Sequence, residues 1–202
     1  MSFHPLMVYD PEKFQQSERR VVEEGPPFEL TRERRAQLDE ILTKYPPERK
    51  RSAVLAALYL VQEQQGYLTA NAMRHIAPLL DLAPAEVEDV ATYYVMFYKE
   101  RVGKYVLQVC RTLSCALNGA ERVTEALSEK LGIKVGETDP SGMFTLMEFE
   151  CLGACDRAPV VMVNNEHWHE HATPETCGKL VDDIKARGEA ALSGCHLKVE
   201  RS

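Results

Sequence analysis

The sequence lacks the features that mark membrane, exported and nucleic-acid-binding proteins. No apolar run approaches the roughly 20 residues that a helix needs to cross a bilayer. The opening MSFHPLMVYDPEKFQQ has no basic start followed by an apolar stretch, so we expect no export signal. Positive charge is scarce, since 24 Lys and Arg residues stand against 31 Asp and Glu. The resulting formal net charge of −7 argues against nucleic acid or an anionic membrane surface as the main partner.

Two nucleotide-binding motifs are also missing. Neither G-x-G-x-x-G nor G-x-x-x-x-G-K-[ST] occurs anywhere in the chain, which excludes a dinucleotide fingerprint and a P-loop. What remains is the composition of an ordinary globular protein, with 45% hydrophobic and 27% charged residues over 202 positions. That is enough material for one domain with an appended unit, or for two small domains. We expect the protein to lie in the cytosol.

The first half of the chain has a helical pattern. Residues 1–30 show no clear periodicity and are expected to form an N-terminal extension. From Thr31 onwards apolar residues recur at helical spacing, and short connections predict a small helical bundle over residues 31–99. Thr69 and Gly66 are expected to cap helices. The predicted helices span residues 31–45, 48–66, 68–82 and 83–100, the last running through Tyr94 and Phe97.

The pattern changes at Gly103. KYVLQVC, residues 104–110, is a short apolar run rich in β-formers and predicts a buried strand. A helix is expected next, with Asn118 as its N-cap, Glu121 three residues later and Gly132 at its end. Further strands are expected at 143–150 and 159–165, a hairpin partner at 166–171 and a last helix at 173–188. This order predicts a small thioredoxin-like layer over residues 103–190, followed by a tail at 191–202, so the fold class is α+β.

The six cysteines suggest metal or redox chemistry, because structural disulfides are rare in a reducing compartment. Cys110 and Cys115 form one pair and Cys151 and Cys155 another, with 35 residues between the pairs. Each pair follows a predicted strand, so neighbouring strands would bring all four sulfurs to one edge of the sheet. Four thiolates held on such loops suit an iron–sulfur cluster. The spacing leaves a structural zinc ion and two disulfides open as alternatives.

The stretches that carry these pairs resemble a known family. GKYVLQVCRTLSC followed by ECLGACDRAPVVMVNN is similar to the small [2Fe–2S] subunit, known as the E-type subunit, of NADH:quinone oxidoreductase, respiratory complex I. LVQEQQGYLT and EVEDVATYYVMFY look like the helical region of that family, so the resemblance covers roughly residues 35–190. It implies a thioredoxin-like [2Fe–2S] ferredoxin domain behind the helical bundle. It also implies one [2Fe–2S] cluster, whose ligands would be Cys110, Cys115, Cys151 and Cys155.

The resemblance implies a one-electron carrier with no catalytic residues of its own. FMN and NADH are then expected on a flavin-bearing partner, the F-type subunit, within the NADH-oxidising module. Other peripheral-arm subunits are further expected partners, on the cytoplasmic side of the inner membrane and without insertion into it. The equivalent subunit of an NAD-linked hydrogenase or formate dehydrogenase is the near alternative. A zinc-stabilised thioredoxin-like adaptor is the alternative from another class, whereas a dithiol–disulfide oxidoreductase would need Cys-x-x-Cys at a helix start.

Several residues next to the cysteines in the sequence are expected to stabilise or destabilise negative charge on the sulfurs. Gly153, without a side chain, is expected to let backbone N–H groups approach the sulfurs. Arg111 and Arg157 are expected to stabilise added negative charge. The acidic residues expected to oppose them are Glu148, Glu150 and Asp156.

The remaining candidates have structural interpretations. The alternating histidines of HWHEH would share one strand face, which we interpret as a solvated hairpin face rather than a metal site: His167, His169 and His171. Cys177 is predicted to be buried in the last helix, and Cys195 to be exposed near the tail. The aromatic stripe at 92–98 is predicted to pack in the bundle core. Pro159 stands where thioredoxin-like folds hold a cis-proline, so we hypothesise a cis Ala158–Pro159 bond.

Overall fold

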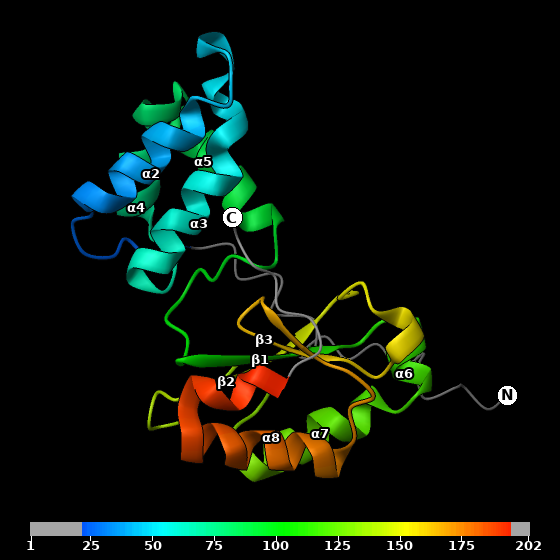
Figure 1. The fold of residues 1–202 in the computed structure, drawn as a ribbon. Helices are drawn as coiled ribbons and strands as arrows, with labels where there is room; N and C mark the ends of the chain where they lie inside the picture. The colour runs from blue at the N-terminus through cyan, green and yellow to red at the C-terminus, as the bar shows by residue number, and fades with distance from the viewer. Residues whose placement is uncertain (1–21, 195–202) are drawn as a thin grey trace, which may run out of the picture. The chain divides into compact units, whose positions relative to one another are not determined.

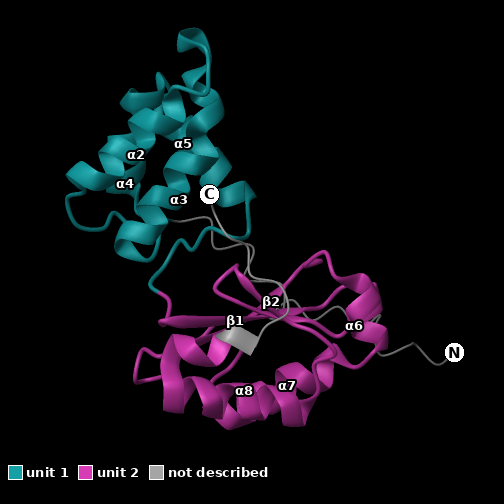
Figure 2. Cartoon of the chain, in the orientation of Figure 1, with its two compact units in different colours: residues 1–101 teal, residues 102–202 magenta. Residues whose placement is uncertain are grey.

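The fold was analysed in a computed structural model, which describes residues 22–194. The chain forms two compact units, residues Met1–Arg101 and residues Val102–Ser202 (Figure 2). The division into four segments that the sequence suggests stays a prediction. Within residues 22–194, no helix has the length and apolar character that crossing a membrane requires.

The first unit is a bundle of short helices (Figure 1). They are α2 (Arg32–Leu42), η3 (Pro47–Ala53), α3 (Val54–Gln65), α4 (Ala70–Ile76), η4 (Ala77–Leu80) and α5 (Pro84–Tyr93). The two predicted caps are confirmed: Thr69 accepts the N–H of Ala72, and Gly66 ends α3 with a φ of 90°. Thr31, which was not predicted as a cap, accepts the N–H of Arg34. The core side chains come from every helix, among them Leu38, Leu58, Met73, Ile76, Leu80 and Val87.

The last helix of this unit is shorter than predicted. It ends at Tyr93, because Tyr94 has extended backbone angles of −92° and 119°, so the prediction of a helix through Tyr94 and Phe97 is wrong. The side-chain amide of Gln62 replaces the missing helical hydrogen bonds: it donates to the carbonyl of Met96 at 3.0 Å and accepts the N–H of Tyr98 at 2.7 Å. Phe97 still packs in the core, edge-on to the ring of Tyr59.

The aromatic stripe at 92–98 is therefore only partly core. Tyr94, Met96 and Phe97 pack against the bundle, as predicted. Tyr93 is 78% exposed and Val95 is 48% exposed, so the prediction of core packing is wrong for these two residues. The end of α5 at Tyr93 explains the difference, because the residues beyond it no longer follow the helical spacing on which the prediction rested.

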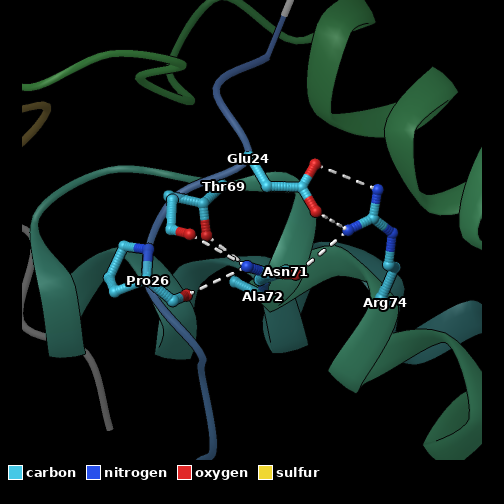
Figure 3. A network of polar contacts seen from close by, with 7 residues as sticks. Glu24, Pro26, Thr69, Asn71, Ala72 and Arg74 are labelled. Carbon is cyan, nitrogen blue, oxygen red and sulfur yellow. Dashed lines mark hydrogen bonds and ion pairs between the residues drawn. The ribbon is translucent and has the colours of Figure 1, made fainter.

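Residues 22–30, the end of the predicted N-terminal extension, run along the start of α4 (Figure 3). The carbonyls of Glu23 and Glu24 accept the N–H groups of Ala70 and Asn71 at 2.9 and 3.1 Å. The side chain of Asn71 donates to the carbonyl of Gly25, and Arg74 forms an ion pair with Glu24. Because the first N–H groups of a helix have no partner within the helix, this segment supplies the acceptors that α4 lacks.

The second unit is a four-stranded mixed sheet with helices on one face (Figure 1). Its strands are β1 (Tyr105–Cys110), β2 (Phe144–Phe149), β3 (Val161–Val163) and β4 (His167–His169), in the order β2-β1-β3-β4. β1 and β2 are parallel, and the other two pairings are antiparallel. Its helices are α6 (Leu113–Leu117), α7 (Ala120–Leu131), η5 (Cys155–Arg157), α8 (Pro174–Arg187) and η6 (Gly188–Gly194). The buried core lies between the sheet and α7 and α8, and it includes Leu107, Leu146, Val161, Leu127, Val181 and Ile184.

The prediction of an N-cap at Asn118 is wrong. α7 begins at Ala120 behind Gly119, which has a φ of 91°. Asn118 instead follows the short helix α6, and its side-chain amide donates to the carbonyl of Ser114 at 2.7 Å. An Asn side chain can bond to the carbonyl of a preceding turn as readily as to the N–H of a following one, and here the preceding turn is a helix that the sequence did not reveal. The predicted end of α7 at Gly132 is confirmed.

Candidate functional site

The pairing of β1 with β2 positions the two cysteine segments. The strands run parallel in register from Tyr105 opposite Phe144 to Cys110 opposite Phe149. Their carboxyl ends therefore meet at the same edge of the sheet, with Cys110 at the end of one strand and Cys151 two residues beyond the other. The N–H of Arg111 donates to the carbonyl of Phe149 at 2.9 Å, which extends the pairing past both strand ends. The predicted proximity of the two strands is confirmed.

The thiols gather at this edge in two pairs. The sulfurs of Cys151 and Cys155 lie 3.4 Å apart. α6, which carries Cys115, lies against η5, which begins at Cys155, so the pair that follows β1 is close to the pair that follows β2. Among residues 22–194, no three His, Cys, Asp or Glu side chains are positioned to hold one metal ion together. The four thiols are thus arranged as two pairs rather than as one group around a single ion.

The two pairs differ in their surroundings. Cys110 and Cys115 are each 2% exposed, whereas Cys151 and Cys155 are exposed. Burial, together with the hydrogen bond from Cys110, raises the pKa of Cys115 to about 12. The N–H of Gly153 donates to the sulfur of Cys151 at 3.4 Å and lowers the pKa of that thiol. The hydrogen bond with Cys151 and the charge of that residue raise the pKa of Cys155.

Gly153 is needed for its backbone conformation. Its φ of 79° lies in the left-handed region, where a residue with a side chain would be strained. No protein atom lies within 4 Å of the place where its Cβ would be, so the positive φ rather than a steric clash is what restricts this position to glycine. The prediction that a backbone N–H reaches a sulfur here is confirmed by the bond from Gly153 to Cys151.

The segment from Cys151 to Pro159 is held by contacts with the hairpin. Trp168 Nε1 donates to the carbonyl of Leu152 at 2.9 Å. The N–H groups of His171 and Ala172 donate to the carbonyls of Arg157 and Pro159 at 2.9 and 2.8 Å. The hypothesis of a cis Ala158–Pro159 bond is confirmed. Sequence reasoning missed Trp168 as a support, although the single tryptophan of the chain, next to a predicted turn, could have signalled it.

The charges around the thiols are largely paired with one another. Arg111 and Glu150, which were expected to oppose each other, form an ion pair at 2.5 Å. Arg157 lies 3.5 Å from Asp156 and 2.8 Å from Glu170, whose side chain is only 4% exposed. Sequence reasoning did not find Glu170. Because these pairs cancel much of their own fields, the groups that touch the sulfurs directly have more influence on the site.

The other candidates lie apart from this cluster of thiols. β4 ends at His169, and His171 follows it with a φ of 48°, so the prediction that the three histidines share one strand face is wrong for His171. His167 and His169 are half-buried rather than fully solvated. The prediction that Cys177 is buried in the last helix is confirmed. Cys195 lies outside the described residues.

The comparison with known families decides what these thiols belong to. The sequence profile of the thioredoxin-like [2Fe-2S] ferredoxins matches residues 38–185. The chain belongs to this family. The predicted fold class is thereby confirmed, because the profile covers both the bundle and the sheet with its four cysteines. Two pairs of thiols at one edge, one pair buried, suit a cluster with two irons.

This ferredoxin has curated relatives over most of its length. It is 43% identical over 148 residues to the E-type subunit of NADH-quinone oxidoreductase from Rickettsia conorii, and the match covers 73% of this chain and 88% of the relative. It is 42% identical over 157 residues to NADH-quinone oxidoreductase subunit 2 of Thermus thermophilus, covering 78% of this chain and 81% of the relative. These names confirm the resemblance found in the sequence. The fold is also similar to that of a chain of the NAD+-reducing [NiFe]-hydrogenase, with a TM-score of 0.58 and 20% identity, over 67% of this chain and 22% of that chain.

The pKa shifts predict an order of thiol reactivity in the ferredoxin after any metal has been removed. The reactive form is the thiolate, and a lowered pKa means more thiolate at a given pH. As the pH rises from about 6 to 9, a small amount of iodoacetamide should label Cys151 first and Cys155 at higher pH. Cys115 and Cys177 should be labelled last, because burial raises the pKa of each to about 12. Peptide mass spectrometry measures the order, and labelling of Cys115 before Cys151 would contradict the electrostatic description of the site.

Proposed function

We propose that this ferredoxin is the electron-carrying subunit of an NADH-oxidising module of the complex I type. Relatives named as subunits of NADH-quinone oxidoreductase are more than 40% identical to it, and it spans 88% and 81% of the length of two of them. The observation that carries the proposal is the convergence of four thiols at one edge of the sheet. The protein would act by taking up and passing on single electrons, with no bond made or broken in a substrate.

Cys110, Cys115, Cys151 and Cys155 are the proposed ligands of the [2Fe–2S] cluster that the family name implies. The bound cluster supplies reversible one-electron chemistry. The residues of this chain fit such a group, because they offer two thiol pairs and a backbone N–H, that of Gly153, already directed at a sulfur. The buried pair excludes water from one side, whereas the exposed pair leaves the other side open to a partner.

The proposed partner is the flavin-bearing subunit of such a module, which would hold FMN and bind NADH. The absence of a dinucleotide fingerprint or P-loop from this chain supports that division of labour. The proposed docking face lies on α6, the helix that carries Cys115. Leu113 and Leu117 are 72% and 67% exposed, and they stand on either side of Cys115 in the same short helix. Large exposed side chains of this kind mark interaction surfaces. The other peripheral-arm subunits, on the cytoplasmic side of the membrane, complete the proposed setting.

An NAD-linked hydrogenase is the second candidate setting. The observation that favours it is the similar fold of the hydrogenase chain at a TM-score of 0.58. At 20% identity that likeness supports the fold alone, whereas the identities with NADH-quinone oxidoreductase subunits exceed 40%. The complex I setting is therefore the better supported of the two.

Replacing one proposed ligand should remove the cluster. The Cys151→Ala variant, purified without oxygen, is expected to lose the visible absorption and the roughly two irons per chain of the parent protein. Cys177→Ala is the matched control, because this cysteine is buried in α8 and should not be needed. Iron analysis and absorption spectroscopy check both variants. A Cys151→Ala protein with the full spectrum would show that the ligand assignment is wrong.

Replacing the two exposed leucines should weaken docking without affecting the cluster. Burying one leucine is worth about 1.5–3 kcal/mol, so the pair Leu113→Ser and Leu117→Ser should reduce affinity for the flavin-bearing subunit at least tenfold. The pair Leu113→Met and Leu117→Met keeps the apolar area and serves as the control. Titration calorimetry with the purified partner gives the affinities. Equal affinity for both double variants would place the interface elsewhere.

A further inference from the structure

Thr112 occupies a capping position but does not cap. It is the residue before α6, with extended backbone angles of −80° and 171°, where a threonine side chain ordinarily accepts an N–H from the first turn. Here its side chain makes no such bond. Thr31, Thr69 and Thr173 all accept one at the starts of their helices, so Thr112 differs from the other threonine caps among the described residues.

The hydroxyl of Thr112 is directed at a sulfur of the first cysteine pair. Its Oγ1 is 3.3 Å from the sulfur of Cys110, within hydrogen-bonding distance for sulfur. Cys110 ends β1, so this contact is made at the edge of the sheet where the cysteine pairs lie.

The direction of the hydrogen bond between Thr112 and Cys110 follows from the chemistry of the two groups. A thiolate ligand carries no proton and can only accept, so the O–H of Thr112 must donate. A hydrogen bond to a sulfur offsets part of its negative charge, and such bonds are among the factors that set the potentials of iron–sulfur proteins. The nearby charges are paired with each other, which leaves this contact as a direct influence on the sulfurs.

We propose that Thr112 is a positioning residue that raises the reduction potential of this site by donating its hydroxyl hydrogen to the sulfur of Cys110. The inference rests on the proposed function, since it needs the four cysteines to hold the cluster. Reduction adds one electron to the site, and the hydroxyl keeps its proton throughout. The added negative charge strengthens the hydrogen bond, so the reduced state gains more from Thr112 than the oxidised state does.

The test is the midpoint potential of the full chain with its cluster, measured by a redox titration followed by EPR. Thr112→Val keeps the shape of the side chain without the hydroxyl, and its potential should be more negative. A tenfold change in the equilibrium constant of the one-electron couple, about 59 mV, is the expected size. Thr112→Ser restores the hydroxyl and should return the potential to near that of the parent. Ser114→Ala removes a hydroxyl from the same helix, and it should leave the potential unchanged.

A second measurement covers the case in which Thr112→Val does not keep the cluster. Electron–nuclear double resonance in H2O and D2O detects an exchangeable proton close to the reduced site. The parent protein and Thr112→Ser should both show the signal of the hydroxyl proton. If neither protein shows this signal, the inference is wrong. Equal potentials in the parent, Thr112→Val and Ser114→Ala would overturn it as well. A parent protein that assembles no [2Fe–2S] cluster would instead refute the proposed function itself.

Discussion

The parallel, in-register pairing of β1 with β2 is the constraint on which the site depends. It aligns Cys110 with Phe149, so that two segments separated by 35 residues in the chain leave the sheet at the same edge. Everything near the sulfurs follows from that alignment. α6 brings Cys115 back beside Cys110, and the loop after β2 brings Cys155 beside Cys151. Because a shift of one residue would turn each side chain to the opposite face, the buried core beneath the sheet fixes the register and with it the site.

The site combines two kinds of environment that a one-electron carrier needs. The thiols of Cys110 and Cys115 are buried, so the sulfurs on that side are protected from water and held by the core. Cys151 and Cys155 are exposed, and so are the apolar side chains of Leu113 and Leu117 on the helix of Cys115. The buried pair of thiols is held rigidly by the core, and the exposed pair is accessible to a partner protein. The ion pairs around the edge, Arg111 with Glu150 and Arg157 with Glu170, offset part of one another's charge.

How much of this could be predicted from the sequence depended on whether a feature was local. The strands, the end of α7 at Gly132 and the cap at Thr69 follow from residue type and spacing, and the predictions of them are confirmed. The position of Asn118 was predicted wrongly because its amide can serve either neighbouring turn. The early end of α5, the run of residues 22–30 along α4 and the support from Trp168 depend on partners far away in the sequence. Local patterns carry no information about such partners.

The central claim is that four sulfurs from two distant segments hold a pair of irons. Low-temperature EPR of the dithionite-reduced protein tests it most directly, because one electron added to two coupled ferric ions leaves a single unpaired spin. The account predicts a signal that integrates to one spin per chain, absent before reduction. A dithionite-treated protein that is colourless, gives no EPR signal and contains one zinc ion would contradict the account.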